Sequence, residues 1–209
     1  IMIDLGLYGG CLSIAFDLSG NLFAGGYFTS TKDGEALRIA KWNGTSWSNL
    51  GAGFNNNCNV VNLDLSGNLY AGVDFTMSGL ETVSYIAKWN GTSWENVGDG
   101  FNNKCRSIDF DSFGNLYAGG DFTYSGNISV NYIAKWNGNS WNNFSDGISN
   151  GLNNFCTNVS LNNLNQIFLL GYFTNSCSNI PCFNICKYSN DYVNILVNSN
   201  NKIPCFEDE

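Results

Sequence analysis

A unit of 47 residues is repeated along most of this chain, and this repeat constrains the fold more than any other feature of the sequence. Trp42, Trp89 and Trp136 are spaced 47 residues apart (89 − 42 and 136 − 89). A second series keeps the same spacing: Trp47, Trp94 and Trp141. A fixed period of this size is typical of repeat architectures, in which each unit buries its apolar face against its neighbours. The fourth copy is longer, and has Tyr188 and Tyr192 at or near the tryptophan positions.

The third copy shows what one repeat contains. Residues 105–111 (CRSIDFD) alternate between apolar and polar side chains, so Ile108 and Phe110 are expected on the buried face of a strand. The same pair recurs in the other copies: Ile14/Phe16, Val61/Leu63 and Val159/Leu161. A Gly-Asn turn follows at residues 112–115, and Leu116 to Gly120 then form a second strand.

A hairpin completes the repeat after a variable polar loop. Tyr132 to Trp136 (YIAKW) predict a third strand, and the step Asn137-Gly138 is a strong hairpin signal. The chain then returns into a fourth strand that begins near Trp141, which would place its ring across from that of Trp136.

Four antiparallel strands in each repeat predict an all-β fold, a β-propeller with four blades of about 47 residues. We assign the repeats to about residues 5–50, 51–97, 98–144 and 145–197 of a single domain (1–209), with a C-terminal tail at 198–209. Residues 1–3 align with 48–50, so they could supply an outer strand to the last blade and close the ring. The alternative is an arc that belongs to a larger propeller or to a ring shared by several chains.

The repeat also resembles a known family. The pattern GNLYAGGDFT…YIAKWNGTSW is similar to the repeats of secreted and cell-surface β-propeller proteins, related in pattern to the kelch and galactose-oxidase propellers. The resemblance covers residues 5–147 well and 148–197 loosely. It implies the repeat type and says little about function, because such propellers serve in adhesion, in scaffolding and, in some members, in catalysis.

Charge and hydropathy exclude two classes of partner. The net charge is −8 with only 9 Lys and Arg residues, so binding to a nucleic-acid backbone is not expected. The longest apolar run, Ile167 to Leu170, is the length of a strand, and no membrane span is expected. The chain starts at Ile1 instead of Met, which would fit a removed leader and would equally fit a trimmed chain.

Eight cysteines point to an oxidising compartment. Four keep the repeat register: Cys11, Cys58, Cys105 and Cys156. They could be small buried residues, two disulfides between neighbouring blades, or a Cys₄ zinc site. The other four are stronger disulfide candidates that would tie the tail to the last blade: Cys177, Cys182, Cys186 and Cys205. Five sequons are compatible with glycosylation in a secreted protein: Asn43, Asn90, Asn127, Asn143 and Asn158.

The absence of histidine argues against an enzyme. It removes the commonest general base, most catalytic zinc sites and a galactose-oxidase-like copper centre, and no cofactor is expected. Asp17, Asp64 and Asp111 recur at equivalent positions before a turn, so we expect them to cap that turn. Asp74 and Asp121, after the glycine pair, are expected to cap loops. A calcium loop is not supported, because no bidentate Glu follows the carboxylates.

Aromatic residues divide into two groups. The six repeated tryptophans are expected in the core, with sugar stacking as the alternative. Four tyrosines break the symmetry and are better ligand candidates: Tyr8, Tyr27, Tyr124 and Tyr172.

Together these features predict a non-enzymatic β-propeller that is secreted or displayed on a cell or virion surface. It would act as an adhesion module or as a component of a coat, fibre or virion. Its partners would be copies of itself, other surface proteins or glycans. The alternative is a carbohydrate-active enzyme with paired Asp residues at the channel mouth.

Overall fold

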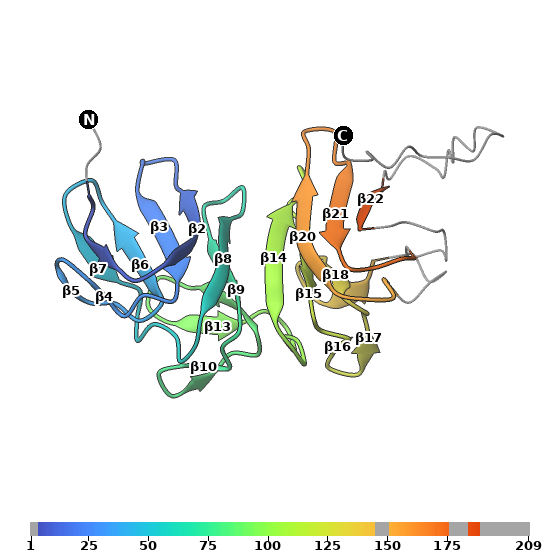
Figure 1. Ribbon diagram of the computed structural model, residues 1–209, viewed down its shortest axis with the longest axis horizontal. Helices are drawn as coiled ribbons and strands as arrows, with labels where there is room; N and C mark the ends of the chain where they lie inside the picture. Colours follow the sequence, from blue (N-terminus) through green and yellow to red (C-terminus); the bar gives the residue numbers. More distant parts are fainter. Residues whose placement is uncertain (1–3, 145–150, 176–183, 189–209) are drawn as a thin grey trace, which may run out of the picture.

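The computed structural model describes residues 4–144, 151–175 and 184–188. These residues form antiparallel β-sheets, and no helix occurs among them. The sheets stand in a row along the longest axis of the molecule, with the first repeat at one end and the last at the other (Figure 1).

Three sheets have four strands each and coincide with the first three repeats. Blade I consists of β2 (Cys11–Phe16), β3 (Leu22–Gly26), β6 (Ile39–Trp42) and β7 (Trp47–Asn49). Blade II consists of β8 (Cys58–Leu63), β9 (Leu69–Val73), β12 (Ile86–Trp89) and β13 (Trp94–Asn96). Blade III consists of β14 (Cys105–Phe110), β15 (Leu116–Gly120), β18 (Ile133–Trp136) and β19 (Trp141–Asn143). The strand order predicted from the repeat is confirmed in all three.

Blade IV consists of β20 (Cys156–Leu161), β21 (Ile167–Gly171) and β22 (Ile185–Tyr188). In blade III, Leu116 is paired with Trp136, and in blade IV the equivalent Ile167 is paired with Tyr188. Tyr188 therefore occupies the first tryptophan position, as the sequence predicts. The position expected for Tyr192 and a fourth strand lies outside the described residues.

The segments predicted as variable loops contain short hairpins of their own. They are built from β4 (Ser30–Thr31) and β5 (Gly34–Glu35), β10 (Met77–Ser78) and β11 (Glu81–Thr82), and β16 (Tyr124–Ser125) and β17 (Ile128–Ser129). The hairpins of the second and third repeats turn through Gly79 and Gly126, which have φ values of 59° and 53°. Glycine at the first position of a two-residue turn adopts this conformation without steric cost.

Two local devices recur along the chain, one in all four repeats and one in the first three, and explain why the strands form where they do. The Asp17 carboxylate accepts hydrogen bonds from the backbone N–H groups of Ser19 and Asn21, which fixes the turn between β2 and β3. The Asn43 side chain does the same for Thr45 and Ser46 in the turn between β6 and β7. These bonds satisfy backbone donors that a tight turn would otherwise leave without partners.

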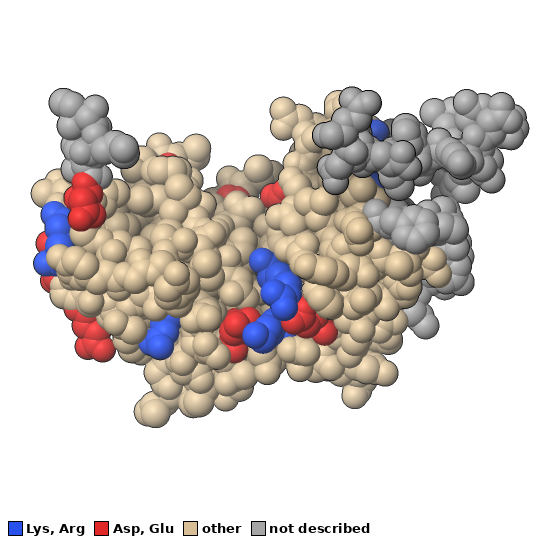
Figure 2. Space-filling model, in the orientation of Figure 1, with Lys and Arg blue, Asp and Glu red and all other residues tan. Residues whose placement is uncertain are grey.

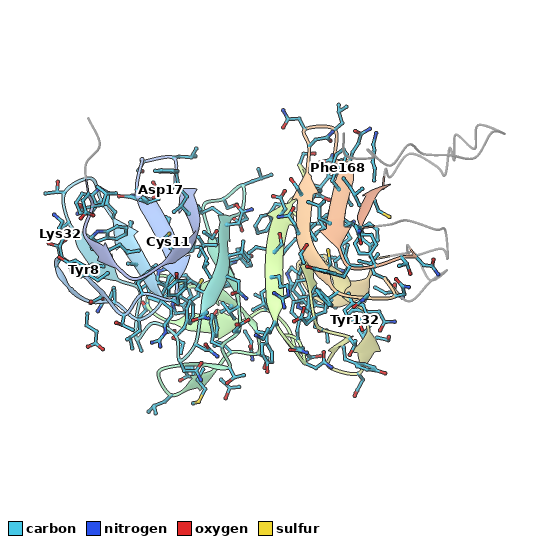
Figure 3. All side chains as sticks on the ribbon, in the orientation of Figure 1. Tyr8, Cys11, Asp17, Lys32, Tyr132 and Phe168 are labelled. Atoms are coloured by element: carbon cyan, nitrogen blue, oxygen red, sulfur yellow. The ribbon has the colours of Figure 1, made fainter. Side chains whose placement is uncertain are left out.

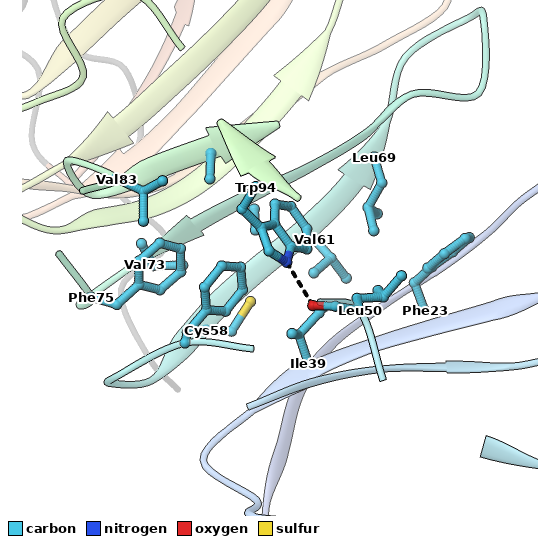
Figure 4. Packing of buried hydrophobic residues seen from close by; sticks show 13 residues of the cluster. Phe23, Ile39, Leu50, Cys58, Val61, Leu69, Val73, Phe75, Val83 and Trp94 are labelled. Atoms are coloured by element: carbon cyan, nitrogen blue, oxygen red, sulfur yellow. Dashed lines mark hydrogen bonds between the residues drawn. The ribbon is translucent and has the colours of Figure 1, made fainter. Parts of the chain in front are cut away.

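Neighbouring blades pack face to face through separate clusters of buried apolar side chains. In the cluster between blades I and II, Phe23 and Ile39 contact the Cys58–Val61 face of the second sheet (Figure 4). The Trp94 Nε1–H donates to the carbonyl oxygen of Leu50 at 3.0 Å, the bond drawn in Figure 4. Trp141 makes the same bond to Val97 at 2.7 Å. Leu50 and Val97 lie just after the last strand of the preceding blade. Each of these tryptophans therefore connects its own blade to the end of the blade before it.

The blades form an open arc, which corrects the expectation of a closed four-bladed ring. The first strands of the four blades lie side by side in the order β2, β8, β14, β20, and β2 and β20 stand at the two ends of this row. Ile14 and Phe16 on β2, predicted as buried, are 55% and 62% exposed. The equivalent Ile108 on β14 is 3% exposed because blade II covers it. The arc named as the alternative agrees with this arrangement.

The segment before β2 belongs to blade I. β1 (Leu7–Tyr8) pairs with β4, and the carbonyl oxygen of Leu5 accepts the Trp47 Nε1–H at 2.8 Å. Residues 1–3, predicted to close the ring on the last blade, lie outside the described residues. The residues that follow them cover the outer part of blade I instead.

Candidate functional site

One edge of the arc combines a constant backbone with side chains that differ from blade to blade. In all four repeats, the residue that follows the second strand donates its backbone N–H to a carbonyl oxygen at 2.9–3.1 Å. This carbonyl belongs to the residue immediately before the first strand of the same repeat. The donors are Tyr27, Asp74, Asp121 and Tyr172, and the acceptors are Gly10, Asn57, Lys104 and Phe155. We refer to these eight residues, together with Asn59 and Arg106, as the rim. The backbone hydrogen bonds of the rim are the same in every repeat, whereas its side chains differ from repeat to repeat.

The middle of the rim is a set of ion pairs. The Arg106 guanidinium donates from Nε and Nη2 to the two carboxylate oxygens of Asp121 at 2.6 and 2.7 Å. The Lys104 ammonium donates to Asp74 at 3.1 Å, and the Asn59 amide donates to the other oxygen of Asp74 at 2.9 Å. Figure 2 shows basic and acidic side chains gathered near the centre of this view. Asp74 and Asp121 are expected from the sequence to cap loops, but their carboxylates bind these side chains instead.

The hydrogen bonds from Arg106 to Asp121 raise the pKa of the guanidinium, and burial acts in the opposite direction. The Arg106 and Lys104 side chains are 38% and 43% exposed, so water screens both pairs. These pairs fix the positions of the side chains more than they stabilise the fold.

Exposed aromatic rings stand at the two ends of the rim. Tyr27 and Tyr172 are 56% and 64% exposed, as predicted for ligand candidates. The Tyr27 ring lies over Gly10, where an added Cβ would come within 2.0 Å of the ring. Tyr172 contacts Phe155 with 4.7 Å between ring centroids, and the Arg106 guanidinium lies 5.6 Å from the centre of the Phe155 ring. The rim thus offers apolar faces beside fixed hydrogen-bonding groups.

The other two candidate tyrosines are also exposed, Tyr8 by 58% and Tyr124 by 48%, but they lie elsewhere. Tyr8, which is labelled in Figure 3, belongs to β1, and Tyr124 belongs to β16. Sequence reasoning missed Asn59, Lys104 and Arg106. A signal was available, since each departs from the residue type found at its position in the other copies.

The carboxylates before the turns are engaged in their own turns, as predicted. Asp17, Asp64 and Asp111 each accept two backbone N–H bonds and one Asn side-chain bond, and Asp111 also accepts the hydroxyl of Tyr117. The bond from the Asn21 side chain is the main cause that lowers the pKa of Asp17. A carboxyl group with a lowered pKa is a poor general acid at neutral pH.

Three of the register cysteines, Cys11, Cys58 and Cys105, are free thiols, which corrects their assignment as disulfide candidates. Cys58, Cys105 and Cys156 are fully buried, whereas Cys11 is exposed. Each buried sulfur lies against a glycine of the preceding blade, so the thiols serve contacts between blades instead of bonding to one another. Burial raises the pKa of the Cys58 and Cys105 thiols above their ordinary range.

No group of three or more His, Cys, Asp and Glu residues that could hold a metal ion occurs in the described ranges. The register cysteines therefore do not form the zinc site considered above. Of the four tail candidates, Cys186 on β22 is buried and is not a free thiol. Cys177, Cys182 and Cys205 lie outside the described residues.

The second tryptophan of each pair is buried: Trp47, Trp94 and Trp141 are 7%, 2% and 2% exposed. The partly buried Trp42, Trp89 and Trp136 face them across the hairpins, with 5.4 Å between ring centroids. Of the sequon residues, Asn43 and Asn90 lie in hairpin turns, Asn127 in the turn before β17, Asn143 at the end of β19 and Asn158 within β20.

The sequence matches no protein-family model and no curated protein. Solved structures do resemble it. The extracellular domain of BT4673 from B. thetaiotaomicron, described as a one-component system, aligns over 88% of this chain and 22% of its own, with 16% identity and a TM-score of 0.56. The extracellular domain of BT3049 from the same organism, described as a hybrid two-component system, aligns over 87% and 22%, with 15% identity and a TM-score of 0.51.

A virginiamycin B lyase from Staphylococcus aureus aligns over 90% of this chain and 59% of its own, with 9% identity and a TM-score of 0.49. The chain spans only part of the BT4673 and BT3049 extracellular domains, 22% of each. No helix in the described residues is long and apolar enough to cross a membrane. At this level of identity the likeness concerns the fold, and the chain has the fold of a β-propeller.

Proposed function

We propose that this chain is a non-enzymatic binding module displayed outside the cytosol, with the rim as its ligand-binding surface. The observation that carries the proposal is the arrangement of the rim: exposed Tyr27 and Tyr172 flank carboxylates that are already paired with Lys104 and Arg106. Aromatic faces beside fixed polar groups suit a glycan or a polar peptide, since such ligands combine apolar faces with many hydrogen-bonding groups.

Paired carboxylates also argue against the alternative, a carbohydrate-active enzyme. A glycosidase needs one carboxyl group that is protonated and one that is free to attack or to activate water. Asp121 is held by both guanidinium bonds, and Asp74 by an ammonium and an amide. Both carboxylate groups are therefore already engaged by side chains of this chain.

A location on a cell or virion surface, or secretion, is supported by three observations of different kinds. The chain has an even number of cysteines, the aligned parts of BT4673 and BT3049 are described as extracellular, and Cys186 is not a free thiol. We propose that Cys186 forms a disulfide with Cys177, Cys182 or Cys205 and so ties the tail to blade IV. Peptide mapping without reductant tests this, and a free, alkylatable Cys186 would contradict it.

An adhesion module or an assembly component of a coat, fibre or virion is the finer form of this proposal. Strands β7, β13 and β19 are edge strands of their sheets, and exposed edges can pair with other chains. Copies of this chain or other surface proteins would therefore contact these strands, or the hairpins at 30–38, 77–84 and 124–131. Sedimentation at micromolar concentration tests self-association.

The rim is tested by a glycan-binding screen together with a panel of glycosidase substrates. We expect binding without turnover, and we expect Tyr172→Ala and Tyr27→Ala to weaken binding at least about tenfold, since each removes a stacking face. The matched controls are Tyr8→Ala and Tyr124→Ala, which remove tyrosines of similar exposure outside the rim. Hydrolysis of a glycan, or equal effects of all four substitutions, would overturn the proposal.

A further inference from the structure

The inner face of blade I is built like a contact surface between blades, but no blade among the described residues covers it. In blade II the face toward the preceding blade contains Cys58 at 0% and Val61 at 3% exposure. Cys105 and Ile108 in blade III, and Cys156 and Val159 in blade IV, are as deeply buried. On blade I the corresponding residues Cys11, Ile14 and Phe16 are all exposed.

The three internal interfaces show what such a face requires of its neighbour. The buried thiols of Cys58, Cys105 and Cys156 lie opposite Gly25, Gly72 and Gly119 of the blade before. A Cβ added to these glycines would come within 2.6, 2.8 and 2.8 Å of the respective sulfur atoms. Any larger residue would therefore separate the two blades, so glycine at this position is a requirement of the interface.

Polar bonds accompany the thiol contact at two of the interfaces. The Ser13 hydroxyl of blade I accepts the Val61 N–H at 3.0 Å and donates to the Val61 carbonyl at 3.4 Å. The Ser107 hydroxyl of blade III makes the same pair of bonds to Val159, both at 3.1 Å. Ile14 is the equivalent of Val61 on blade I, so its backbone is available for the same bonds.

The last blade of a second copy does not meet the requirement. Blade IV has Leu170 where the other blades have glycine, and this side chain is 41% exposed. In the geometry of the internal interfaces, Leu170 would overlap the sulfur of Cys11. The same overlap would oppose packing of blade IV against β2 of its own chain. Figure 3 labels Cys11 in the first blade and Phe168 in the last blade.

We infer that the face formed by Cys11, Ile14 and Phe16 is a docking surface for a β-blade of a partner protein with the same repeat type. The partner blade has glycine opposite Cys11. Residues 4–8 already cover the outer part of this side of blade I, so the incoming blade would contact mainly the inner strand β2. This face begins at Cys11, next to Gly10 of the rim. The two proposals can still fail separately, because one is read by alkylation of Cys11 and the other by glycan binding.

The experiment presents such a blade to the full chain. Ile1, Ser48 and Glu95 are equivalent positions, because they are spaced 47 residues apart. A second copy of residues 58–94 fused to the N-terminal side of Ile1 therefore keeps the repeat in register. The copy carries Cys58→Ser, so that it adds no thiol of its own. The matched control is identical except that the copy also carries Gly72→Leu, which reproduces the residue type of Leu170.

The measurement is the rate at which Cys11 is alkylated in the native state, read by peptide mapping. In the unextended chain we expect Cys11 to react and Cys58 and Cys105 to be protected. In the extended chain we expect Cys11 to react at least about tenfold more slowly, since docking removes it from solvent. In the leucine control we expect it to remain as reactive as in the unextended chain.

Protection of the native Cys58 and Cys105 in every variant shows that the original blades are folded. The inference is overturned if the copy fails to protect Cys11, or if the leucine control protects it equally. It is also overturned if Cys11 of the unextended chain becomes protected as concentration rises and Ile14→Asp prevents this, because the occupant would then be a second copy of this chain.

Discussion

Strands β2 and β14 have nearly the same sequence pattern and opposite environments. Both run from a cysteine through an isoleucine to a phenylalanine, and both pair with a second strand in the same register, including the same irregularity after the cysteine. Ile108 on β14 is 3% exposed and Ile14 on β2 is 55% exposed. The difference shows that alternation predicts which residues share a face, whereas burial of that face depends on a neighbouring blade.

The largest effect is expected where the covered interfaces depend on tryptophan. Trp94→Ala should lower the free energy of unfolding by about 3–5 kcal/mol, because it leaves a cavity and removes the bond to Leu50. Trp47→Ala should cost less, because only residues 4–8 cover that side of blade I. Reversible denaturant melts measure both. Equal losses would mean that the end segment covers blade I as well as a blade does.

The isoleucine pair gives the most direct test, because one substitution is made at two equivalent positions. Ile108→Ala should cost about 2–5 kcal/mol, as is typical of a buried isoleucine. Ile14→Ala should change the free energy of unfolding by no more than about 0.5 kcal/mol, as at other exposed sites. A loss above 1.5 kcal/mol at Ile14, by the same melts, would contradict its exposure.

The glycine that faces each buried cysteine gives a further test of the covered interfaces. Gly25→Ala should cost about 1–3 kcal/mol, because the new Cβ would overlap the Cys58 sulfur and crowd Val61. Combining it with Cys58→Ala should recover part of the loss, since the two residues are in contact. Gly20→Ala is a poor control, because its φ of 81° adds strain. Purely additive losses in the double variant would contradict the contact.

Alkaline pH should weaken the covered interfaces selectively. Burial raises the pKa of Cys58 and Cys105, so both remain neutral in the folded chain while they ionise near pH 8.5 in the unfolded chain. The contribution of these two neutral thiols to the free energy of unfolding is thus complete below about pH 8.5. Above it, this contribution falls by about 1.4 kcal/mol per pH unit for each thiol. Melts between pH 7 and pH 10 measure the slope, which Cys58→Ala should reduce. An unchanged slope in that variant would contradict the prediction.

Much of the fold could be predicted from the sequence because each repeat carries its own local signals. The Asn43-Gly44 step and the Asp17 turn depend on residues within a few positions, so they could be recognised in one copy. The open arc could not be predicted in this way, because it depends on whether another blade covers Cys11. The sequence shows that Leu170 departs from the repeat. That a leucine there would prevent packing against a cysteine follows only from the close approach of Gly119 to Cys156 in the structure.

The rim was predicted in part, for the same reason. Tyr27 and Tyr172 could be singled out because they interrupt a repeated position. The pairing of Arg106 with Asp121 joins residues 15 positions apart through the geometry of two strands, and no local motif marks it. Residues that serve the repeat are therefore easier to identify from sequence than residues that serve a site.

The smallest effect on stability is expected at the rim, where side chains fix a surface and do not fill a core. Asp121→Asn should lower the free energy of unfolding by no more than about 1 kcal/mol, because the pair with Arg106 is partly exposed and screened by salt. The substitution leaves the guanidinium without its carboxylate, so binding to the rim should change far more than stability does. Melts at low and high salt, run beside a ligand-binding assay, separate the two effects. Asp33→Asn is a useful control, since this carboxylate accepts the Trp47 N–H at 2.7 Å and lies outside the rim. If Asp121→Asn destabilised the chain by several kcal/mol and left binding intact, the ion pair would be part of the fold, and the rim would have to be defined by its tyrosines alone.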